Sequence, residues 1–391
     1  MVKKNTKKTS KTPSRREKKP RPRAVKTPAP RAAKPRLRAP VTLKPVDREF
    51  YARRVRDFLP TWIVDVHAHV WRQADTPVPS AADPRVVSWP RLVAAECTIE
   101  SLLETYRLLL PGKQVLPLIF GNLPTGGNLA AINAYTAHAA RAARVPALIF
   151  SDPCWTAEEF EPRIRAANFI GAKSYLTLAP DHIPSAEVRI LDFFPPHQLD
   201  VLNQHGWIMM LHLPRSGRLR DPLNLAQLRE IDRYYPNIRL IVAHVGRAYC
   251  DHDVGDAFAA LADTRSLCFD ISANTNARVF ELLLRAVGPR RVLYGTDLPI
   301  ECMRMRRVER DGRYVNIVPR GLYGDVSHDP NMGDVDGDEA AALTLFLYEE
   351  IDAFRRAAEA VKLSRADIDS VFAGNATRLL TGAGWRAENR P

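Results

Sequence analysis

Short apolar segments recur eight times along the chain, and longer stretches with helical spacing of apolar residues separate them. Segments such as QVLPLIF (114–120) and RLIVAHVG (239–246) are continuously apolar, as in strands buried on both faces of a parallel sheet. The expected strands lie within 61–71, 114–120, 145–150, 169–176, 206–214, 239–246, 266–272 and 291–299. Eight strands alternating with helices predict an α/β fold, the (β/α)8 or TIM barrel. An open doubly wound sheet is the alternative, but no GxGxxG or GxxxxGK[ST] loop follows any strand.

The first expected strand ends in the sequence DVHAH, which carries two histidines one residue apart. Side chains alternate along a strand, so His67 and His69 should point to the same side. Two imidazoles at the end of a buried strand make half of a metal site. An isolated pair of this kind is equally consistent with two structural histidines, so later strand ends must decide between the two interpretations.

Four later strands supply further polar residues near their carboxyl ends: Lys173, His212, His244 and Asp297. In a closed barrel these ends surround one cavity, so topology alone would bring the four side chains close to the histidine pair. Each of them could be structural when considered singly. Three of these four imidazoles and the carboxylate, arranged around an open position, would match the ligands of a catalytic zinc-like site.

The positive charge of the chain is concentrated in its first 45 residues. The whole chain carries +13, and this segment holds 17 of the 57 Lys and Arg residues but only one of the 44 acidic residues. The remaining residues therefore carry a small net negative charge. Residues 1–45 are rich in Lys, Arg and Pro without an apolar period, which predicts a disordered tail. We expect residues 46–391 to form the enzyme domain, and the tail either to bind nucleic acid or an anionic surface or to be only a solvated extension.

The five cysteines are widely spaced and never form a CxxC pair, which argues against a disulfide framework or a thiolate zinc knuckle. No run of 18 apolar residues and no secretory signal pattern is present, so the expected location is the cytoplasm. The expected partner is a small-molecule substrate, and a homodimer is an open alternative.

The ordered set of strand-end motifs resembles the amidohydrolase superfamily, in particular the amidohydrolase-related family that includes aminocarboxymuconate-semialdehyde decarboxylase. The matching motifs are DVHAH (65–69), GAKSY (171–175), LHLP (211–214), AHVG (243–246), YGTDLP (294–299) and FAGNATRLL (372–380). The resemblance implies that His67, His69, His212 and Asp297 bind one divalent ion, with Zn²⁺ expected first and Mn²⁺ or Fe²⁺ as alternatives. It also implies that His244 orients water or substrate beside the ion.

The resemblance further implies a hydrolase, in which Asp297 takes a proton from a metal-bound water that attacks an amide, ester or lactone. His244 would then stabilise the oxyanion or shuttle the proton. A carboxy-lyase that decarboxylates a small acidic substrate is the runner-up. Lys173 either lines the cavity as a cation or, once carbamylated, bridges two metals. A third alternative is a catalytically silent binding module, which a metal assay would distinguish.

Residues 301–338 form a long insertion after the last expected strand. Its place beside Asp297 suggests a lid rather than a disordered loop, with His328 as a substrate contact. Three aspartates in this insertion resemble a calcium loop only weakly. Arginines after the ligand-bearing strands could bind an acidic substrate, although surface positions are commoner; these are Arg72, Arg215, Arg218 and Arg247.

Overall fold

The computed structural model describes residues 41–75, 90–122 and 127–386. Residues 1–40 of the expected disordered tail lie outside the described residues. All five cysteines are described, and each is a free thiol.

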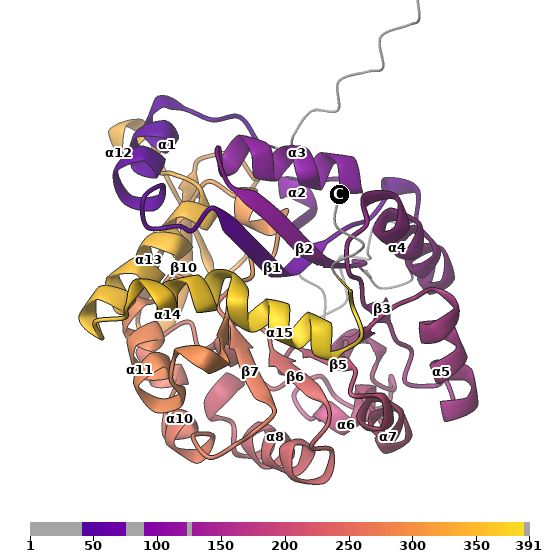
Figure 1. The fold of residues 1–391 in the computed structure, drawn as a ribbon. Helices are drawn as coiled ribbons and strands as arrows, with labels where there is room; N and C mark the ends of the chain where they lie inside the picture. The colour runs from indigo at the N-terminus through magenta and orange to yellow at the C-terminus, as the bar shows by residue number, and fades with distance from the viewer. Residues whose placement is uncertain (1–40, 76–89, 123–126, 387–391) are drawn as a thin grey trace, which may run out of the picture. The chain divides into compact units, whose positions relative to one another are not determined.

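Eight parallel strands form the centre of the fold and close into a barrel (Figure 1). They are β1 (Trp62–His69), β2 (Gln114–Phe120), β3 (Ile149–Phe150), β4 (Gly171–Ser174), β5 (Ile208–Leu211), β6 (Arg239–Val242), β7 (Leu267–Asp270) and β8 (Val292–Leu293). Strands β3 to β8 pair in sequence order, and β1 pairs with β2. Parallel bridges at Ala68–Leu298 and Ile119–Ala147 join these two sheets, so the expected (β/α)8 barrel is confirmed.

Helices surround the strands (Figure 1). The main ones are α3 (Ile99–Leu109), α4 (Leu129–Ala143), α5 (Ala157–Ala166), α7 (Pro196–His205), α8 (Pro222–Tyr234), α11 (Ala277–Val287), α13 (Phe346–Ala360) and α15 (Asn375–Gly382). Shorter helices are α1 (Pro45–Phe50), α2 (Pro90–Val93), α6 (Ile190–Phe193), α9 (His244–Arg247), α10 (Ala257–Ala260), α12 (Gly337–Ala342) and α14 (Arg365–Asp369).

Helix starts in the barrel are set by side chains that cap free backbone N–H groups. Asn128, Asp221 and Asn276 accept hydrogen bonds from the first turns of α4, α8 and α11. Each such cap stabilises a helix by about 1 kcal/mol. These caps fix where the three helices begin.

The strands are shorter than their apolar segments, and this shortening positions the site. Strand β8 ends at Leu293, so residues 294–299 continue as a loop that carries Asp297. Likewise β6 ends at Val242, and His244 begins the short helix α9. Functional side chains of parallel barrels are expected on such segments after the strands.

The insertion after β8 is an ordered three-stranded sheet, so the alternative of a disordered loop is wrong. Its strands are β9 (Arg306–Arg310), β10 (Arg313–Pro319) and β11 (Met332–Val335), with β10 between the other two. A small apolar cluster that includes Met303, Met305 and Phe346 lies beneath it. Two of the three aspartates that resembled a calcium loop, Asp334 and Asp336, pair instead with Arg320.

The structure moves the boundary of the enzyme domain toward the N-terminus. Val41 and Leu43, which were assigned to the tail, pack against the barrel core. The buried Arg304 binds the carboxylate of Asp47 at 2.6 and 2.8 Å and reaches the carbonyl of Thr42 at 3.4 Å. Residues 41–45 therefore belong with the barrel rather than with the tail.

None of the helices in the described ranges has both the length and the apolar content needed to cross a membrane.

Candidate active site

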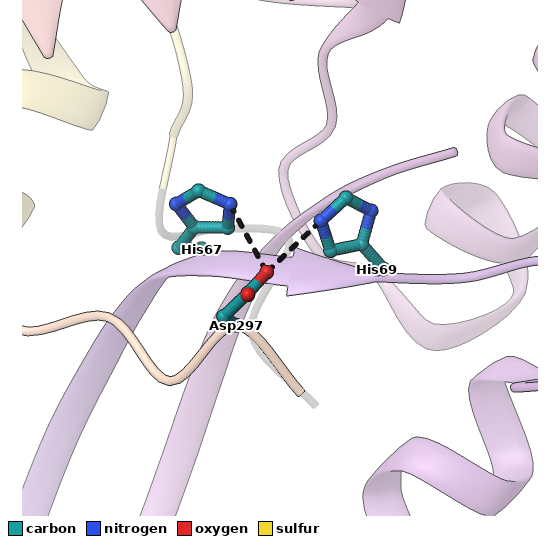
Figure 2. A group of neighbouring side chains, drawn as sticks. All are labelled: His67, His69 and Asp297. Carbon is teal, nitrogen blue, oxygen red and sulfur yellow. Dashed lines mark ion pairs between the residues drawn. The ribbon is translucent and has the colours of Figure 1, made fainter. Parts of the chain in front are cut away.

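Two histidines of β1 and the aspartate after β8 converge at one end of the barrel (Figure 2). Oδ1 of Asp297 lies 3.1 Å from Nε2 of His69 and 3.4 Å from Nε2 of His67. The His67 side chain is fully buried, whereas those of His69 and Asp297 remain 15% and 13% exposed. Solvent or substrate can therefore approach the group from the side of His69 and Asp297.

The hydrogen bonds on the far side of each ring decide which nitrogen faces Asp297 as a lone pair. Nδ1 of His69 lies 3.0 Å from the carbonyl oxygen of Gly121, which can only accept, so Nδ1 carries the proton. Nδ1 of His67 lies 2.9 Å from the carboxylate of Asp270 and is protonated for the same reason. In the neutral rings, both Nε2 atoms then carry lone pairs. That of His69 faces Asp297, and that of His67 lies between Asp297 at 3.4 Å and Nζ of Lys173 at 3.0 Å.

This arrangement fits a bound cation. With a neutral His69, a nitrogen lone pair and a carboxylate oxygen face each other at 3.1 Å with no proton between them. A divalent ion shared by the Nε2 atoms of His67 and His69 and by the Asp297 carboxylate would remove that repulsion. Metal-binding histidines usually donate their other N–H to a carboxylate or carbonyl, as His67 and His69 do here.

Asp270, at the end of β7, organises the site from beneath and was missed in the sequence. Its Oδ2 accepts from His67, and its Oδ1 accepts from the backbone N–H of His244 at 2.8 Å and the hydroxyl of Ser272 at 2.6 Å. The signal was visible, because Asp270 is an acidic residue near the end of an apolar strand, like Asp297. His67, His244 and Asp270 form a second group with metal-binding geometry, but Asp270 already binds His67 through Nδ1. We therefore assign this group to orienting the rings.

His244 is held beside His67 by strand β7. Nδ1 of His244 lies 3.1 Å from the carbonyl oxygen of Ser272, so Nδ1 is again the protonated nitrogen. The ring centroids of His244 and His67 are 4.7 Å apart. Nε2 of His244 is thus left to exchange a proton or bind an oxygen atom.

His212 lies next to this group but does not join it. Its ring centroid is 5.2 Å from that of His244 and 4.8 Å from that of Tyr175. Among the described residues, none of the three groups with metal-binding geometry includes His212, and its buried Nδ1 finds no hydrogen-bond partner there. The role of His212 as a ligand therefore stays a prediction.

Lys173 of β4 places a buried cation inside the site. Its Nζ lies 3.0 Å from Nε2 of His67 and 4.0 Å from the centre of the Phe120 ring. Burial lowers the pKa of Lys173 to about 8, against the opposing charges of Asp297 and Asp270. The ammonium is thus mostly protonated at neutral pH.

Burial also lowers the pKa of each of the four histidines. The pKa of His244 falls to about 4, with burial as the main cause and the neighbouring His67 adding to it. Those of His67 and His69 are lowered by burial and by Lys173, and that of His212 lies well below its usual value. Burial alone would raise the pKa of Asp297, but the neighbouring rings of His69, His67 and His244 hold it below its ordinary value. Neutral imidazoles and an ionised carboxylate are the protonation states that bind metals.

Buried contacts lock the end of β1 to β8 behind the two histidines. The carboxylate of Asp65 accepts hydrogen bonds from the His67 backbone at 2.8 Å, from Tyr106 at 2.5 Å, and from the hydroxyl and backbone of Thr296 at 2.5 and 3.1 Å. Burial raises the pKa of Asp65 to about 7, against these hydrogen bonds. A Cβ at Gly295 would lie 2.8 Å from Cβ of His67, so only glycine lets β8 pass this close.

The backbone itself is strained where two site residues leave their strands. Asp297 and His244 have φ angles of 50° and 56°, a region that residues other than glycine rarely occupy. Such conformations cost about 1–3 kcal/mol and persist where surrounding contacts enforce them. Here the contacts of β7 and β1 hold these side chains in the site.

Two expected substrate contacts are engaged elsewhere. Arg215 binds the helix-capping Asp221 at 3.2 Å, and the His328 side chain is 90% exposed beside Asp325. Arg247 donates to the carbonyl of Leu213, and Arg218 pairs with Asp253. The role of Arg215 and His328 as substrate contacts therefore stays a prediction, whereas Lys173 is a cation within contact distance of the His67 ring.

The chain belongs to the amidohydrolase family, because a family model described as amidohydrolase matches residues 64–381. It is thus an enzyme of the metal-dependent amidohydrolase superfamily, and the expected superfamily assignment is confirmed. A search of curated proteins finds no match.

Solved structures support the same fold at low sequence identity. An amidohydrolase from Burkholderia multivorans aligns with a TM-score of 0.52 and 16% identity, over 82% of this chain and 99% of that one. The 5-carboxyvanillate decarboxylase from Sphingomonas paucimobilis aligns with a TM-score of 0.50 and 12% identity, over the same shares of the two chains.

Proposed function

We propose that this enzyme hydrolyses an amide, ester or lactone bond in a small acidic substrate, using one divalent ion held by His67, His69 and Asp297. The observation that carries the proposal is the Nε2 lone pair of His69, which faces the Asp297 carboxylate at 3.1 Å with Nε2 of His67 beside it. A nitrogen lone pair and a carboxylate oxygen that face each other repel, and a cation bound between them turns both into ligands.

The donor set indicates which ions suit the site. Two imidazole nitrogens and a carboxylate oxygen are borderline ligands that accept Zn²⁺, Mn²⁺ or Fe²⁺, and we take zinc as the first choice. A bound ion of this kind polarises carbonyl oxygens and makes water acidic near neutral pH. His212, whose ring lies beside that of His244, is our proposed additional ligand.

Asp297 and His244 are the residues we assign to proton transfer. Asp297 is ionised and partly exposed, so it can accept the proton of an attacking water. His244 is neutral, with Nδ1–H bound to Ser272, so Nε2 can take up a proton or accept a hydrogen bond from the reacting group. Proton transfer by a positioned side chain contributes about 10²- to 10⁴-fold to a rate.

Lys173 is the residue we assign to the acidic group of the substrate. Its ammonium is fully within the barrel, and no carboxylate among the described residues forms an ion pair with it within 4 Å. A buried cation of this kind gains from an anionic ligand more than a surface cation does. This assignment replaces Arg215 and His328, which have other neighbours.

Decarboxylation is the second candidate, and Lys173 is also the observation that favours it. A cation 3.0 Å from His67 could hold a substrate carboxylate next to the ion. The 5-carboxyvanillate decarboxylase with a similar fold carries out a reaction of this type by its name, which makes the candidate worth testing in parallel.

The deciding experiment combines metal analysis with a panel of carboxylated aromatics, lactones, amides and esters. Hydrolysis gives a new acid without release of carbon dioxide, whereas decarboxylation releases it, so product analysis separates the two candidates. His244→Ala should keep its metal and lose at least about a hundredfold in turnover. Loss of metal in that variant would make His244 a ligand and overturn its assigned role.

A further inference from the structure

A third group of side chains with metal-binding geometry lies outside the active site, between the loop after α9 and strand β9. Cys250, His252 and Glu309 each direct one donor atom into a common space, and these atoms all lie within 4.8 Å of one another. Cys250 is completely buried, while the other two close the group from the surface.

The carboxylate contacts of His252 leave one of its nitrogens available to a cation. Nε2 of His252 lies 3.4 Å from the carboxylate of Asp253, which favours a proton on Nε2. Nδ1 then presents its lone pair to Glu309, whose Oε1 is 3.8 Å away. That separation is too long for a hydrogen bond, but it is close to the roughly 3.3 Å between two ligands of one tetrahedral zinc ion.

Asp253 keeps this loop in place independently of any ion. Its Oδ2 accepts from the backbone N–H groups of Tyr249 and Cys250 at 3.1 and 2.9 Å and binds Arg218 at 2.6 Å. A carboxylate that holds both the loop and the distal nitrogen of a histidine is the usual support of a protein metal ligand.

We propose that Cys250, His252 and Glu309 bind a second divalent ion of the zinc type, separate from the active-site ion. One thiolate and one carboxylate neutralise the two charges of such an ion, and the thiolate selects zinc over magnesium or calcium. The fourth position is open to water. The odd cysteine count and the missing CxxC pattern concealed this site in the sequence.

The ion links the inserted sheet to the barrel. Tyr249 and Tyr314 already pack edge to face with centroids 4.9 Å apart, and Arg307 lies over both rings at 4.6 Å. Arg307 also donates to the carbonyl of Ala273 at 2.6 Å. Since Ala273 follows Ser272, which holds His244, the ion would stabilise the insertion at the side of the active site.

Cobalt spectroscopy on the full-length protein tests this site independently of catalysis. The chain is freed of metal with a chelator and titrated with Co²⁺. The active-site ligands are nitrogen and oxygen only, so a near-ultraviolet sulfur-to-cobalt charge-transfer band reports on a cysteine ligand alone. We expect the band in the natural chain and in His67→Ala, and its loss in Cys250→Ser.

Two variants nearer the surface test the same site even if the Cys250→Ser chain fails to fold. Glu309→Gln and His252→Ala each remove one ligand, and each should weaken cobalt binding at the thiolate site by about tenfold or more. Cys154→Ser, which changes an exposed cysteine elsewhere, is the matched control and should keep the band. A band that is absent in the natural chain at saturating cobalt, that persists in Cys250→Ser, or that is unaffected in both surface variants overturns the proposal.

Discussion

Nε2 of His69 faces the carboxylate of Asp297 at 3.1 Å, while the carbonyl of Gly121 binds the other nitrogen of the same ring. The carbonyl fixes the proton on Nδ1, so two acceptors meet on the open side of the ring. This opposition sets the site apart from an ordinary buried histidine–aspartate pair, in which the ring donates to the carboxylate.

Asp297→Asn should lower the metal content by about one ion per chain, because an amide is a weak ligand at a site built for a carboxylate. Elemental analysis of the purified variant measures this directly. His138→Ala, which changes an exposed histidine of α4, should retain the metal of the natural chain. Equal metal content in Asp297→Asn and the natural protein would refute the site.

If elemental analysis finds two ions per chain, the sulfur-to-cobalt charge-transfer band distinguishes between two explanations. A second ion at Cys250 carries a thiolate signature, whereas a second ion bridged by a carbamylated Lys173 does not. The second result would move Lys173 from substrate binding to metal binding.

Asp270→Asn should weaken metal binding by about 10- to 100-fold while leaving the chain folded. The amide can still occupy the space, but it no longer forces the proton of His67 onto Nδ1, so Nε2 is less often the free ligand. A competition titration with a metal chelator gives the affinity. Asp263→Asn, at an exposed position, is the matched control, and an unchanged affinity in Asp270→Asn would rule out the orienting role.

The buried carboxyl groups of Glu301 and Glu350 should make folding stability depend on pH. Burial raises the pKa of both carboxyl groups well above 4.5. Glu301 raises the pKa of Glu350 further, whereas the contact with Glu350 partly lowers that of Glu301. Neither oxygen of Glu350 makes a hydrogen bond of ordinary geometry among the described residues. The folded state therefore keeps a proton that the unfolded chain releases above about pH 4.5.

The direction in which stability changes with pH follows from these raised pKa values. The contribution of these two carboxyl groups to stability should be fully present below about pH 4.5 and should fall as pH rises, by about 1.4 kcal/mol per pH unit for each retained proton. Glu350→Gln should have a shallower decline, measured by denaturant unfolding from pH 5 to 8. Glu187→Gln, at an exposed position, should follow the natural chain. Parallel declines in the natural chain and Glu350→Gln would contradict a shared buried proton.

A chain that starts at residue 41 should keep the thermal midpoint and activity of the full-length protein, whereas one that starts at residue 46 should melt a few degrees lower. The shorter chain loses the apolar contacts of Val41 and Leu43 and the carbonyl of Thr42 that faces Arg304. Differential scanning calorimetry of the three chains measures the midpoints. Identical midpoints in all three would return residues 41–45 to the tail.

Any affinity for nucleic acid should disappear in the chain that starts at residue 41 and should fall steeply with salt in the full-length chain. Contacts of Lys and Arg side chains with phosphates act mainly through counterion release, which produces this dependence. Binding that survives truncation and resists salt would show that the barrel itself contacts nucleic acid.

The sequence by itself predicted the barrel, which the structure confirms, and most residues of the candidate site. Apolar segments alternate with helices, and parallel strands of a closed barrel must end on the same side. His67, His69, His244, Lys173 and Asp297 could therefore be placed together from their positions at or just after strand ends. That argument uses only topology, which local patterns specify.

The tertiary structure alone decided which atoms face each other. The bond between His67 and Asp270 joins residues 203 positions apart, and the protonated nitrogen of each histidine depends on such distant partners. The inserted sheet was missed because its strands are short and partly exposed, so they lack a continuous apolar pattern. Cys250 and Glu309 lie on separate segments, and only the docking of β9 against the loop after α9 brings a thiol and a carboxylate together, because spacing along a chain does not encode side-chain direction across an interface.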